Sequence, residues 1–390
     1  MEYLFARRLE GMRRSTIREI LKVAEQPDVI SFAGGLPAPE LFPVDAVRAA
    51  CDRVLIREGS WALQYGPSEG YTPLREYLVE AMAQRGVACR VENVQVTSGS
   101  QQALDLLGRC FLNPGDVVLT ENPTYLAAIQ AFQGSEARFV PVPTDDNGLI
   151  PEALPELVAK HQPRFLYTIP NFQNPTGITM PAERRRALYE TAAKLSLVIV
   201  EDDPYGLLRY TGEHVPPIKA LDTEGIVIYA STFSKTIAPG LRVGWVVADR
   251  QILDKLLILK QAADLHTSSL DQRVACEFMT SCDTTAHLAQ IRASYGTRYQ
   301  AMDAALRALL PERYQWTHPE GGMFLWVTCP EGVDTWPLMQ RAVEHKVLFV
   351  PGCDFFPEGG GDRYMRLNFS NSTPERIQEG VARLAQLLRE

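Results

Sequence analysis

The sequence lacks the patterns that mark a zinc site, a disulfide framework, a secreted chain or a membrane protein. Its seven cysteines include no Cys-x-x-Cys pair, and their number is odd, so neither a tetrahedral zinc site nor a closed set of disulfides is expected. No apolar run reaches the roughly 18 residues of a membrane helix, and the N-terminal segment has no long apolar core of the signal-peptide type. We therefore expect a cytoplasmic protein with reduced thiols, no metal and no membrane partner.

An excess of positive charge is also missing. The chain has 39 lysines and arginines against 47 aspartates and glutamates, for a formal net charge of -8. A nucleic-acid or anionic-lipid surface would favour a basic patch, so we expect neither partner. The Walker pattern is absent too, and a nucleoside triphosphate is not implied.

What the chain does contain is a regular alternation of short apolar runs and helical periodicity. The runs that we predict as strands are 94–99, 116–120, 164–170, 197–203, 226–230 and 243–248. Apolar strands separated by helices are typical of an α/β fold with a mostly parallel sheet that helices cover on both faces.

The chain of 390 residues is long for one core, and its pattern divides it into two predicted domains. Residues 45–290 carry the α/β alternation and form the large domain. Residues 291–390 form a smaller α+β domain, which also takes in the N-terminal segment 1–44. Within that segment, the proline- and glycine-rich stretch 31–43 is predicted to be a linker between the domains.

Ligands of open α/β sheets bind at the carboxyl ends of the strands, so the residues after each strand are the ones to inspect. Ser100 and Gln101 begin a helix directly after a strand, and their free N–H groups suit a phosphate, although a helix cap looks the same. NFQNPTG (171–177) follows another strand and also fits a simple turn. EDDPY (201–205) places carboxylates at a buried strand end, where they need a partner.

The stretch STFSKTIAPGLRVGW (231–245) is the most informative of these strand ends. A buried Lys235 that loses its proton could attack a carbonyl. Arg242 suits a phosphate, because its planar fork binds two oxygens at once. Thr232 and Ser234 add hydroxyl donors. Together these groups predict a pocket for a phosphate ester that carries an aldehyde.

The segments, in their order along the chain, resemble the fold-type I pyridoxal-phosphate aminotransferases, most closely the branch with 2-aminoadipate (LysN-like) and kynurenine aminotransferases. The resemblance covers nearly the whole chain. Each motif is weak alone, whereas the ordered set is very specific. The set is ISFAGGLPAPELFP, LQYGPSEGYTPLR, TSGSQQALDL, NFQNPTG, EDDPY, STFSKTIAPGLRVGW, ADLHT, GGMFLW and MRLNFS.

The resemblance implies pyridoxal 5′-phosphate as cofactor and a role for each matching residue. Lys235 forms the Schiff base with the cofactor and then moves the proton between the substrate α-carbon and the cofactor. Asp202 pairs with the pyridinium nitrogen, which keeps the ring an electron sink. Tyr205 and Asn174 hydrogen-bond the phenolic oxygen of the ring, and Tyr125 stacks on its face. The residues implied to hold the phosphate are Ser100, Gln101, Thr232, Ser234 and Arg242.

The resemblance also implies a homodimer and a site for amino acids and 2-oxo acids. Tyr65 would reach the phosphate of the partner subunit. Arg366 would bind the substrate α-carboxylate, with Asn174 and the backbone of Gly34 and Gly35 nearby. The implied reaction is ping-pong transfer of an amino group from an L-amino acid to a 2-oxo acid.

Substrate choice is harder to predict. STIREI (15–20) matches a short helix that caps the site in the 2-aminoadipate branch, and its Arg18 would read a distal carboxylate. A solvated helix arginine explains the same residue equally well. With a mobile cap, broad specificity is expected: 2-aminoadipate and glutamate with 2-oxoglutarate, and leucine or aromatic amino acids in turn.

Three other functions fit parts of the sequence. GPSEG (66–70) matches the Gly-x-Ser-x-Gly elbow of hydrolases formally, but the elbow needs a helix that starts at the serine, and the helix signal here comes later, at Thr72 and Pro73. A cofactor-sensing regulator would carry a DNA-binding domain, and residues 1–44 have no such pattern. A lyase or decarboxylase with the same cofactor stays open, although Arg366 favours transamination by orienting the α-C–H bond.

Overall fold

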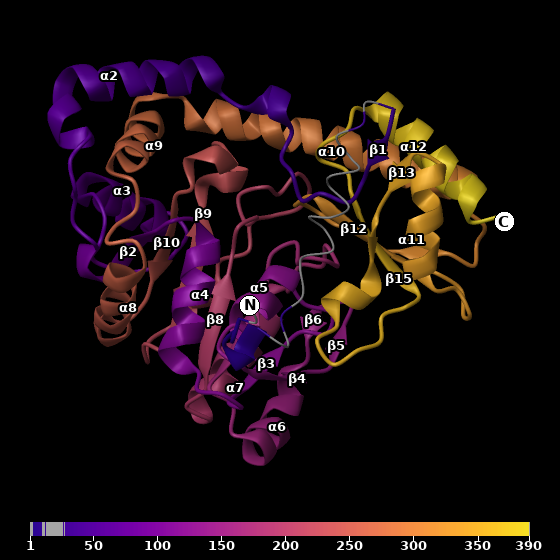
Figure 1. The fold of residues 1–390 in the computed structure, drawn as a ribbon, viewed down its shortest axis with the longest axis horizontal. Coiled ribbons are helices and arrows are strands. Elements are labelled where there is room, and N and C mark those ends of the chain that lie inside the picture. The colour runs from indigo at the N-terminus through magenta and orange to yellow at the C-terminus, as the bar shows by residue number, and fades with distance from the viewer. Residues whose placement is uncertain (1–2, 10–11, 13–25, 27, 390) are drawn as a thin grey trace.

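The computed structural model describes residues 3–9, 12, 26 and 28–389 (Figure 1). Its centre is a seven-stranded sheet in the order β2-β10-β9-β8-β7-β3-β4. Strand β10 is antiparallel to both of its neighbours, and the remaining adjacent pairs are parallel. The mostly parallel sheet is thereby confirmed. The strands are β2 (Val94–Thr97), β3 (Val117–Thr120), β4 (Arg138–Pro141), β7 (Phe165–Thr168), β8 (Val198–Asp202), β9 (Val227–Thr232) and β10 (Gly244–Val247).

Each predicted strand overlaps one strand of this sheet, and only β4 was missed. Strand β4 lies at the sheet edge, and of its four residues Phe139 alone is buried. An edge strand with so few buried positions has no apolar run to signal it.

Alternate residues of the central strands pack on opposite faces of the sheet, as the pleat requires. Leu119, Leu166 and Ile199 belong to a cluster with residues of α6 and α7. Val118, Val200 and Ile228 belong to another cluster, with residues of α4, α5 and α8. Helices therefore cover both faces, as predicted. Their bounds are α4 (Ser100–Phe111), α5 (Leu126–Gln133), α6 (Leu154–His161), α7 (Ala182–Lys194) and α8 (Arg250–Ala263).

Three further helices pack beside the β2 end of the sheet around a separate apolar cluster. They are α2 (Val44–Ala62), α3 (Thr72–Ala83) and α9 (Ser269–Ser281). Helix α3 begins at Thr72 with Pro73 in its first turn, so Tyr71, and not Thr72, is the residue before the helix. Ser68 lies in the turn that precedes it. No helix starts at this serine, which removes the geometric basis for a nucleophile elbow.

The C-terminal part contains a four-stranded antiparallel sheet in the order β11-β12-β15-β14. Strand β1, near the N-terminus, pairs in parallel with β13 in a separate two-stranded sheet. A segment near the N-terminus therefore also belongs to the C-terminal part of the fold. The elements are β1 (Ile30–Ser31), β11 (Gln315–Trp316), β12 (Phe324–Thr328), α11 (Thr335–Glu344), β13 (Val347–Leu348), β14 (Val350–Pro351), β15 (Tyr364–Asn368) and α12 (Pro374–Leu387); β5 (Thr144–Asp145) and β6 (Gly148–Leu149) form a separate hairpin.

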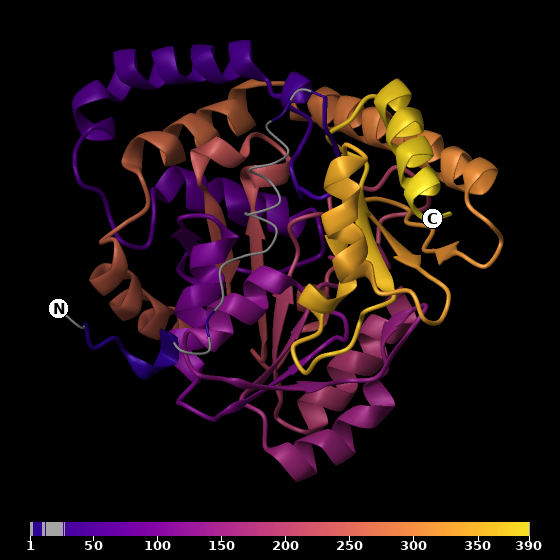
Figure 2. The same cartoon turned by 45° about the vertical axis from the view of Figure 1, so that its right-hand side comes forward.

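One long helix, α10 (Thr284–Leu309), runs through the position where the sequence pattern placed a domain boundary. In Figures 1 and 2 it extends from beside α9 to the C-terminal elements, so it belongs to both parts of the molecule. All seven cysteines are free thiols. Within the described ranges, no helix is both long and apolar enough to cross a membrane.

Candidate active site

The residues after strand β9 place Lys235 at the carboxyl edge of the central sheet. The strand passes directly into a single 3₁₀ turn, Phe233–Lys235, and the Thr232 side chain caps this turn by accepting a hydrogen bond from the Ser234 N–H at 3.1 Å. Lys235 Nζ donates to the carbonyl of Gly35 at 2.9 Å. A segment from the start of the chain therefore lies over the lysine that the sequence singled out.

The environment of Lys235 favours a neutral amine. Burial, together with the positive charges of Arg366 and Arg242, lowers the pKa of its ammonium group to about 8. A neutral amine has a free lone pair and can attack a carbonyl carbon. Near pH 8, about half of the lysine is therefore in the neutral form that a nucleophile requires.

This shift predicts a pH dependence for cofactor capture. We expect the rate at which the cofactor-free chain takes up pyridoxal phosphate to rise with pH and to level off above about 8, because only the neutral amine reacts. Stopped-flow absorbance between about pH 6 and about pH 11 measures this rate. The same series with N-acetyl-lysine corrects for titration of the cofactor itself. A midpoint at the ordinary lysine pKa of about 10.4 would contradict the expectation.

Two adjacent carboxylates end strand β8, and their contacts distinguish them. Asp203 accepts hydrogen bonds from Arg85 at 2.5 Å and Asn171 at 2.9 Å, and these donors hold its pKa below the ordinary value. Among the described residues, Asp202 accepts only from the Tyr167 hydroxyl, at 2.8 Å, and its buried Oδ1 has no hydrogen-bond partner there. Burial raises the pKa of Asp202 to about 7. Asp202 is thus the carboxylate that a cationic ligand would satisfy.

Three of the other predicted ring contacts lie around Asp202. Tyr205 is buried, and burial raises its pKa, while a side-chain hydrogen bond with Asn174 acts in the opposite direction. The charges of Tyr125 and Asp202 also act on the Tyr205 hydroxyl, so these groups are close together. Tyr125 itself is the residue just before α5. The structure therefore brings both tyrosines and Asn174 to one place.

The turn between β2 and α4 has the geometry of a phosphate cradle. Gly99, the residue before α4, has a φ of 77°, which favours glycine. A Cβ at Gly99 would also collide with the Arg242 guanidinium. Ser100 and Gln101 follow as the first helical residues, and the N–H groups at such a helix start are free to bind an anion.

Hydroxyls and the Arg242 fork complete this cradle. Arg242 lies 3.5 Å from the Ser234 hydroxyl, which in turn is 2.9 Å from that of Thr232. The Gln101 side chain points elsewhere, because its Nε2 donates to the carbonyl of Ala127. Of the five predicted phosphate residues, Gln101 could therefore contribute through its backbone alone in this arrangement.

Arg366, on β15, is the group best placed for a substrate carboxylate. It is 1% exposed and donates to Asn174 Oδ1 at 2.7 Å and to the Ala33 carbonyl at 2.6 Å. Its Nε is buried with no hydrogen-bond partner in the described chain. The rings of Phe324 and Phe355 lie 4.3 and 5.1 Å from the guanidinium carbon. A buried, incompletely paired guanidinium suits an anionic ligand.

The backbone at Gly34 and Gly35 runs between Arg366 and Lys235. Arg366 holds it through the carbonyl of Ala33, and Lys235 holds it through that of Gly35. A Cβ at Gly35 would lie 3.2 Å from the Phe324 ring. Glycine therefore lets this segment lie close against the site.

Two predicted residues are not part of this cluster. Tyr65 follows α2, is 78% exposed, and makes an edge-to-face contact with His266 at 5.7 Å. Within this subunit it does not reach the other site residues through any contact that the structure shows. Arg18 lies outside the described residues.

The cluster fits pyridoxal phosphate, group by group. The unpaired buried Oδ1 of Asp202 suits a protonated ring nitrogen, the Gly99 turn with Arg242 suits the phosphate, and Lys235 suits the aldehyde. Tyr205 and Asn174 suit the phenolic oxygen. No group of three or more metal-ligating side chains occurs in the described part of the chain.

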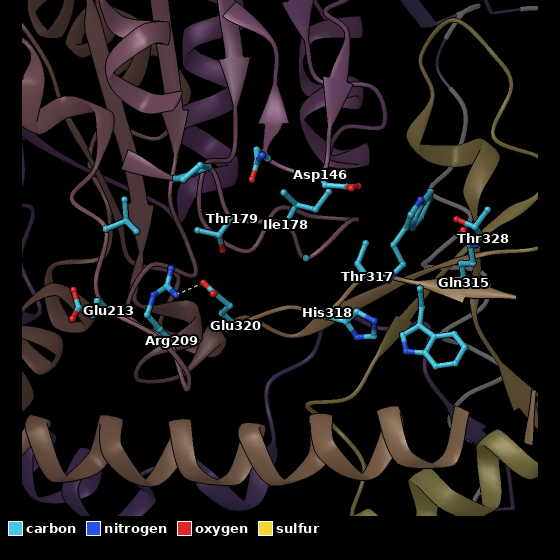
Figure 3. A pocket seen from close by; sticks show the side chains of 16 residues that line it. Asp146, Ile178, Thr179, Arg209, Glu213, Gln315, Thr317, His318, Glu320 and Thr328 are labelled. Carbon is cyan, nitrogen blue, oxygen red and sulfur yellow. Dashed lines mark hydrogen bonds and ion pairs between the residues drawn. The ribbon is translucent and has the colours of Figure 1, made fainter. Parts of the chain in front are cut away.

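A large cleft lies elsewhere. It has a volume of about 690 Å³, and its lining residues come from 146–147, 177–181, 209–215 and 315–328, which include no predicted site residue. Figure 3 shows Arg209 and Glu320 facing each other within it as an ion pair. The large volume alone would have pointed to the wrong place, because the reactive groups gather at the sheet edge.

Sequence reasoning missed the residues that support the site. Asp203 anchors the end of β8 through Arg85 and Asn171, and its carbonyl accepts from the Ser231 hydroxyl at 2.8 Å. Asn171 lies inside NFQNPTG and Asp203 inside EDDPY. Arg85 follows α3, far away in sequence, and no local signal indicates its partner.

Comparison with known proteins gives the same picture over the whole chain. The model of the family described as aminotransferase class I and II matches residues 27–384. Aromatic-amino-acid aminotransferase 1 of Thermococcus litoralis is 47% identical over 395 residues, covering 100% of this chain and 95% of the relative. LysN of Thermus thermophilus, an alpha-aminoadipate aminotransferase complexed with N-(5′-phosphopyridoxyl)-L-leucine, has a TM-score of 0.93 at 42% identity, covering 99% and 97%. Kynurenine aminotransferase of Pyrococcus horikoshii, in complex with PMP, has a TM-score of 0.94 at 44% identity, covering 99% and 96%.

Proposed function

The chain belongs to the class I and II aminotransferases and is a pyridoxal 5′-phosphate-dependent enzyme of transamination, and we propose that Lys235, Asp202 and Arg366 carry its reaction. One observation supports this assignment above all others. A lysine of lowered pKa, a buried carboxylate oxygen with no partner in the described part of the chain, and a buried arginine meet at one edge of the sheet. The substrates are amino acids and 2-oxo acids, and the overall transfer is ping-pong.

Residues from different strand ends hold different parts of the cofactor. When bound, pyridoxal phosphate supplies an aldehyde that accepts the amino group and a ring that withdraws electrons from the α-carbon. The Gly99 turn and Arg242 would bind the phosphate, with the Thr232 and Ser234 hydroxyls. Asp202 would keep the ring nitrogen protonated, because the ionised carboxylate gains a cationic partner. Tyr125 would contact the ring, and Tyr205 and Asn174 would bind the phenolic oxygen.

Lys235 and Arg366 act on the substrate. Lys235 Nζ takes the proton from the α-carbon and later returns it, for which a neutral amine of pKa about 8 is suited. Arg366 binds the α-carboxylate in a buried pocket, where a charge-assisted hydrogen bond is strong. This contact fixes the direction of the α-C–H bond and so favours its cleavage over loss of the carboxylate.

Broad substrate specificity is the second part of the proposal. The names of the relatives refer to aromatic amino acids, aminoadipate and kynurenine. This range suits a site in which the residue that recognises the substrate side chain contacts some substrates and not others. We assign the reading of a distal carboxylate on 2-aminoadipate or glutamate to Arg18. Leucine and aromatic amino acids would bind without that contact.

Replacing Arg18 with alanine tests whether this residue recognises the distal carboxylate of the substrate. We expect kcat/KM for 2-aminoadipate and glutamate to fall about tenfold or more, because a charge-assisted hydrogen bond is lost, and kcat/KM for leucine to change less than twofold. Coupled assays with 2-oxoglutarate measure both the new 2-oxo acid and the glutamate formed. For the glutamate donor, 2-oxoadipate replaces 2-oxoglutarate as the acceptor.

Arg7→Ala is the matched control, since Arg7 is an exposed arginine of the same terminal segment that pairs with Glu136 at 2.8 Å. Equal losses for acidic substrates and leucine would remove Arg18 as the reader. Carbon dioxide released without formation of the 2-oxo acid would instead identify a decarboxylase and overturn the proposed reaction.

A homodimer in the cytoplasm completes the proposal. Tyr65 is large, aromatic and mostly exposed in a single subunit, which suits a residue that contacts a second copy. Its proposed place is against the cofactor phosphate of that copy.

A further inference from the structure

Lys260 is a buried cation for which the reaction described above has no use. It lies near the C-terminal end of α8 and is 0% exposed. The motif ADLHT (263–267) begins three residues later, and the family resemblance gave it no role. Lysine is almost never fully buried unless it is paired, so the partners of Lys260 show what holds it there.

All three protons of Lys260 have acceptors. Its Nζ donates to Gln102 Oε1 at 2.8 Å, to Thr267 Oγ1 at 3.0 Å and to Asp264 Oδ1 at 3.0 Å. Burial lowers the pKa of Lys260, while the Asp264 carboxylate acts in the opposite direction. The cation thus joins α4, through Gln102, to the turn that follows α8.

The same partners hold the residue before the phosphate cradle. Gln102 Oε1 also accepts the Ser98 N–H at 2.8 Å. Asp264 Oδ2 accepts from the Ser98 hydroxyl and from Gln102 Nε2, both at 2.7 Å. Ser98 therefore has its backbone and its side chain fixed by two groups that Lys260 binds, and it directly precedes Gly99.

Stability alone does not require this arrangement. A buried ion pair replaced by apolar side chains of similar size is often neutral or stabilising. Polar networks of this kind are useful where a geometry must be unique, and the geometry here is that of the cradle. Arg242 Nη2 donates to the Ser98 carbonyl at 3.4 Å, so the cradle arginine depends on the same residue.

We propose that Lys260 and Asp264 are positioning residues that hold residues 98–101 in the conformation that binds the cofactor phosphate. They act through Ser98 and Gln102 and do not touch the cofactor. This inference rests on the proposed assignment of the Gly99 turn to the phosphate.

Comparing two ligands that differ only by the phosphate tests the inference. We measure dissociation constants of pyridoxal phosphate and pyridoxal for the cofactor-free chain by absorbance titration. Lys260→Met is expected to weaken pyridoxal phosphate about tenfold or more, because the cradle loses its anchored geometry, and to change pyridoxal less than twofold. Asp264→Asn is expected to act in the same direction. Lys255→Met, which removes an exposed lysine of the same helix, should leave both constants unchanged.

The remaining outcomes are also decisive. If Lys260→Met fails to fold, the double variant Lys260→Met/Asp264→Leu removes both charges, and the same selective loss is expected of it. Equal weakening of both ligands, or no change in either, would overturn the inference and leave a merely structural ion pair. If the wild-type chain binds pyridoxal as tightly as pyridoxal phosphate, the assigned phosphate site itself is wrong, which separates the two failures.

Discussion

Replacing Lys235 with alanine is expected to lower the rate of amino-group transfer by about 10³-fold or more, because the chain loses its proton-transfer base and its nucleophile together. The fold should persist, since Lys235 makes one hydrogen bond to a carbonyl and its burial as a cation is unfavourable. Steady-state assays with a good amino donor and 2-oxoglutarate measure the loss.

The control for Lys235→Ala is Lys255→Ala, at an exposed position of α8, which should keep the wild-type rate. Circular dichroism checks that both variants are folded. A folded Lys235→Ala variant that keeps more than about a tenth of the wild-type rate would contradict the assignment, because a general base contributes about 10² to 10⁴.

Replacing Asp202 with asparagine is expected to lower kcat by about 10²-fold or more, with a smaller effect on KM. The neutral amide no longer stabilises the protonated ring nitrogen, while the α-carboxylate contact of Arg366 stays. At pH 8 the cofactor-free variant should be at least as stable as wild type. Burial raises the pKa of Asp202 to about 7 from 3.8. Ionisation of Asp202 therefore lowers the free energy of unfolding as the pH rises between these two values, the loss is complete at pH 8, and asparagine removes it.

Asp203→Asn separates this role from the mere presence of a carboxylate. Arg85 stabilises Asp203 as an anion and lowers the pKa of this carboxyl in the folded chain. Its contribution to the free energy of unfolding is therefore fully present at any pH above the aspartate pKa of the unfolded chain. The substitution should lower the free energy of unfolding by about 3 kcal/mol, measured by urea unfolding at pH 8. If Asp203→Asn lowered kcat at full saturation as strongly as Asp202→Asn without destabilising the fold, the two roles would have to be exchanged.

Much of the site could be predicted because parallel strands bring residues distant in sequence to one edge. The segments after β2, β7, β8 and β9 were each ambiguous alone, but the topology of a mostly parallel sheet places them together. Lys235 and Arg242 needed no more than that, whereas the choice of Asp202 among the three adjacent carboxylates followed from the family resemblance. Arg366, on a different sheet, followed from the family resemblance and not from strand order.

What the sequence could not predict depends on contacts across the fold. Asp202 and Asp203 are adjacent and chemically identical, and only their partners show which one has an unsatisfied oxygen. Lys260 and Asp264 have the spacing of an ordinary solvated helix pair, yet Lys260 is buried. Strand β10 reads like its parallel neighbours but runs antiparallel.

The domain boundary was equally hidden. The periodicity of α10 is continuous from Thr284 to Leu309, and a helix that packs against both parts of a molecule shows no break in its sequence. The division at 290 therefore stays a prediction about folding units, while the secondary structure runs through it.

An absorbance spectrum of the holoenzyme shows whether Lys235 carries the cofactor. We expect a visible band from the cofactor bound to Lys235, which an amino donor such as glutamate bleaches and 2-oxoglutarate restores. We also expect that Lys235→Ala, freed of bound amines, lacks the band. A wild-type chain without the band, or a band that persists in Lys235→Ala, would contradict the mechanism, and a band in wild type that no amino acid bleaches would identify a cofactor-binding module without transaminase activity.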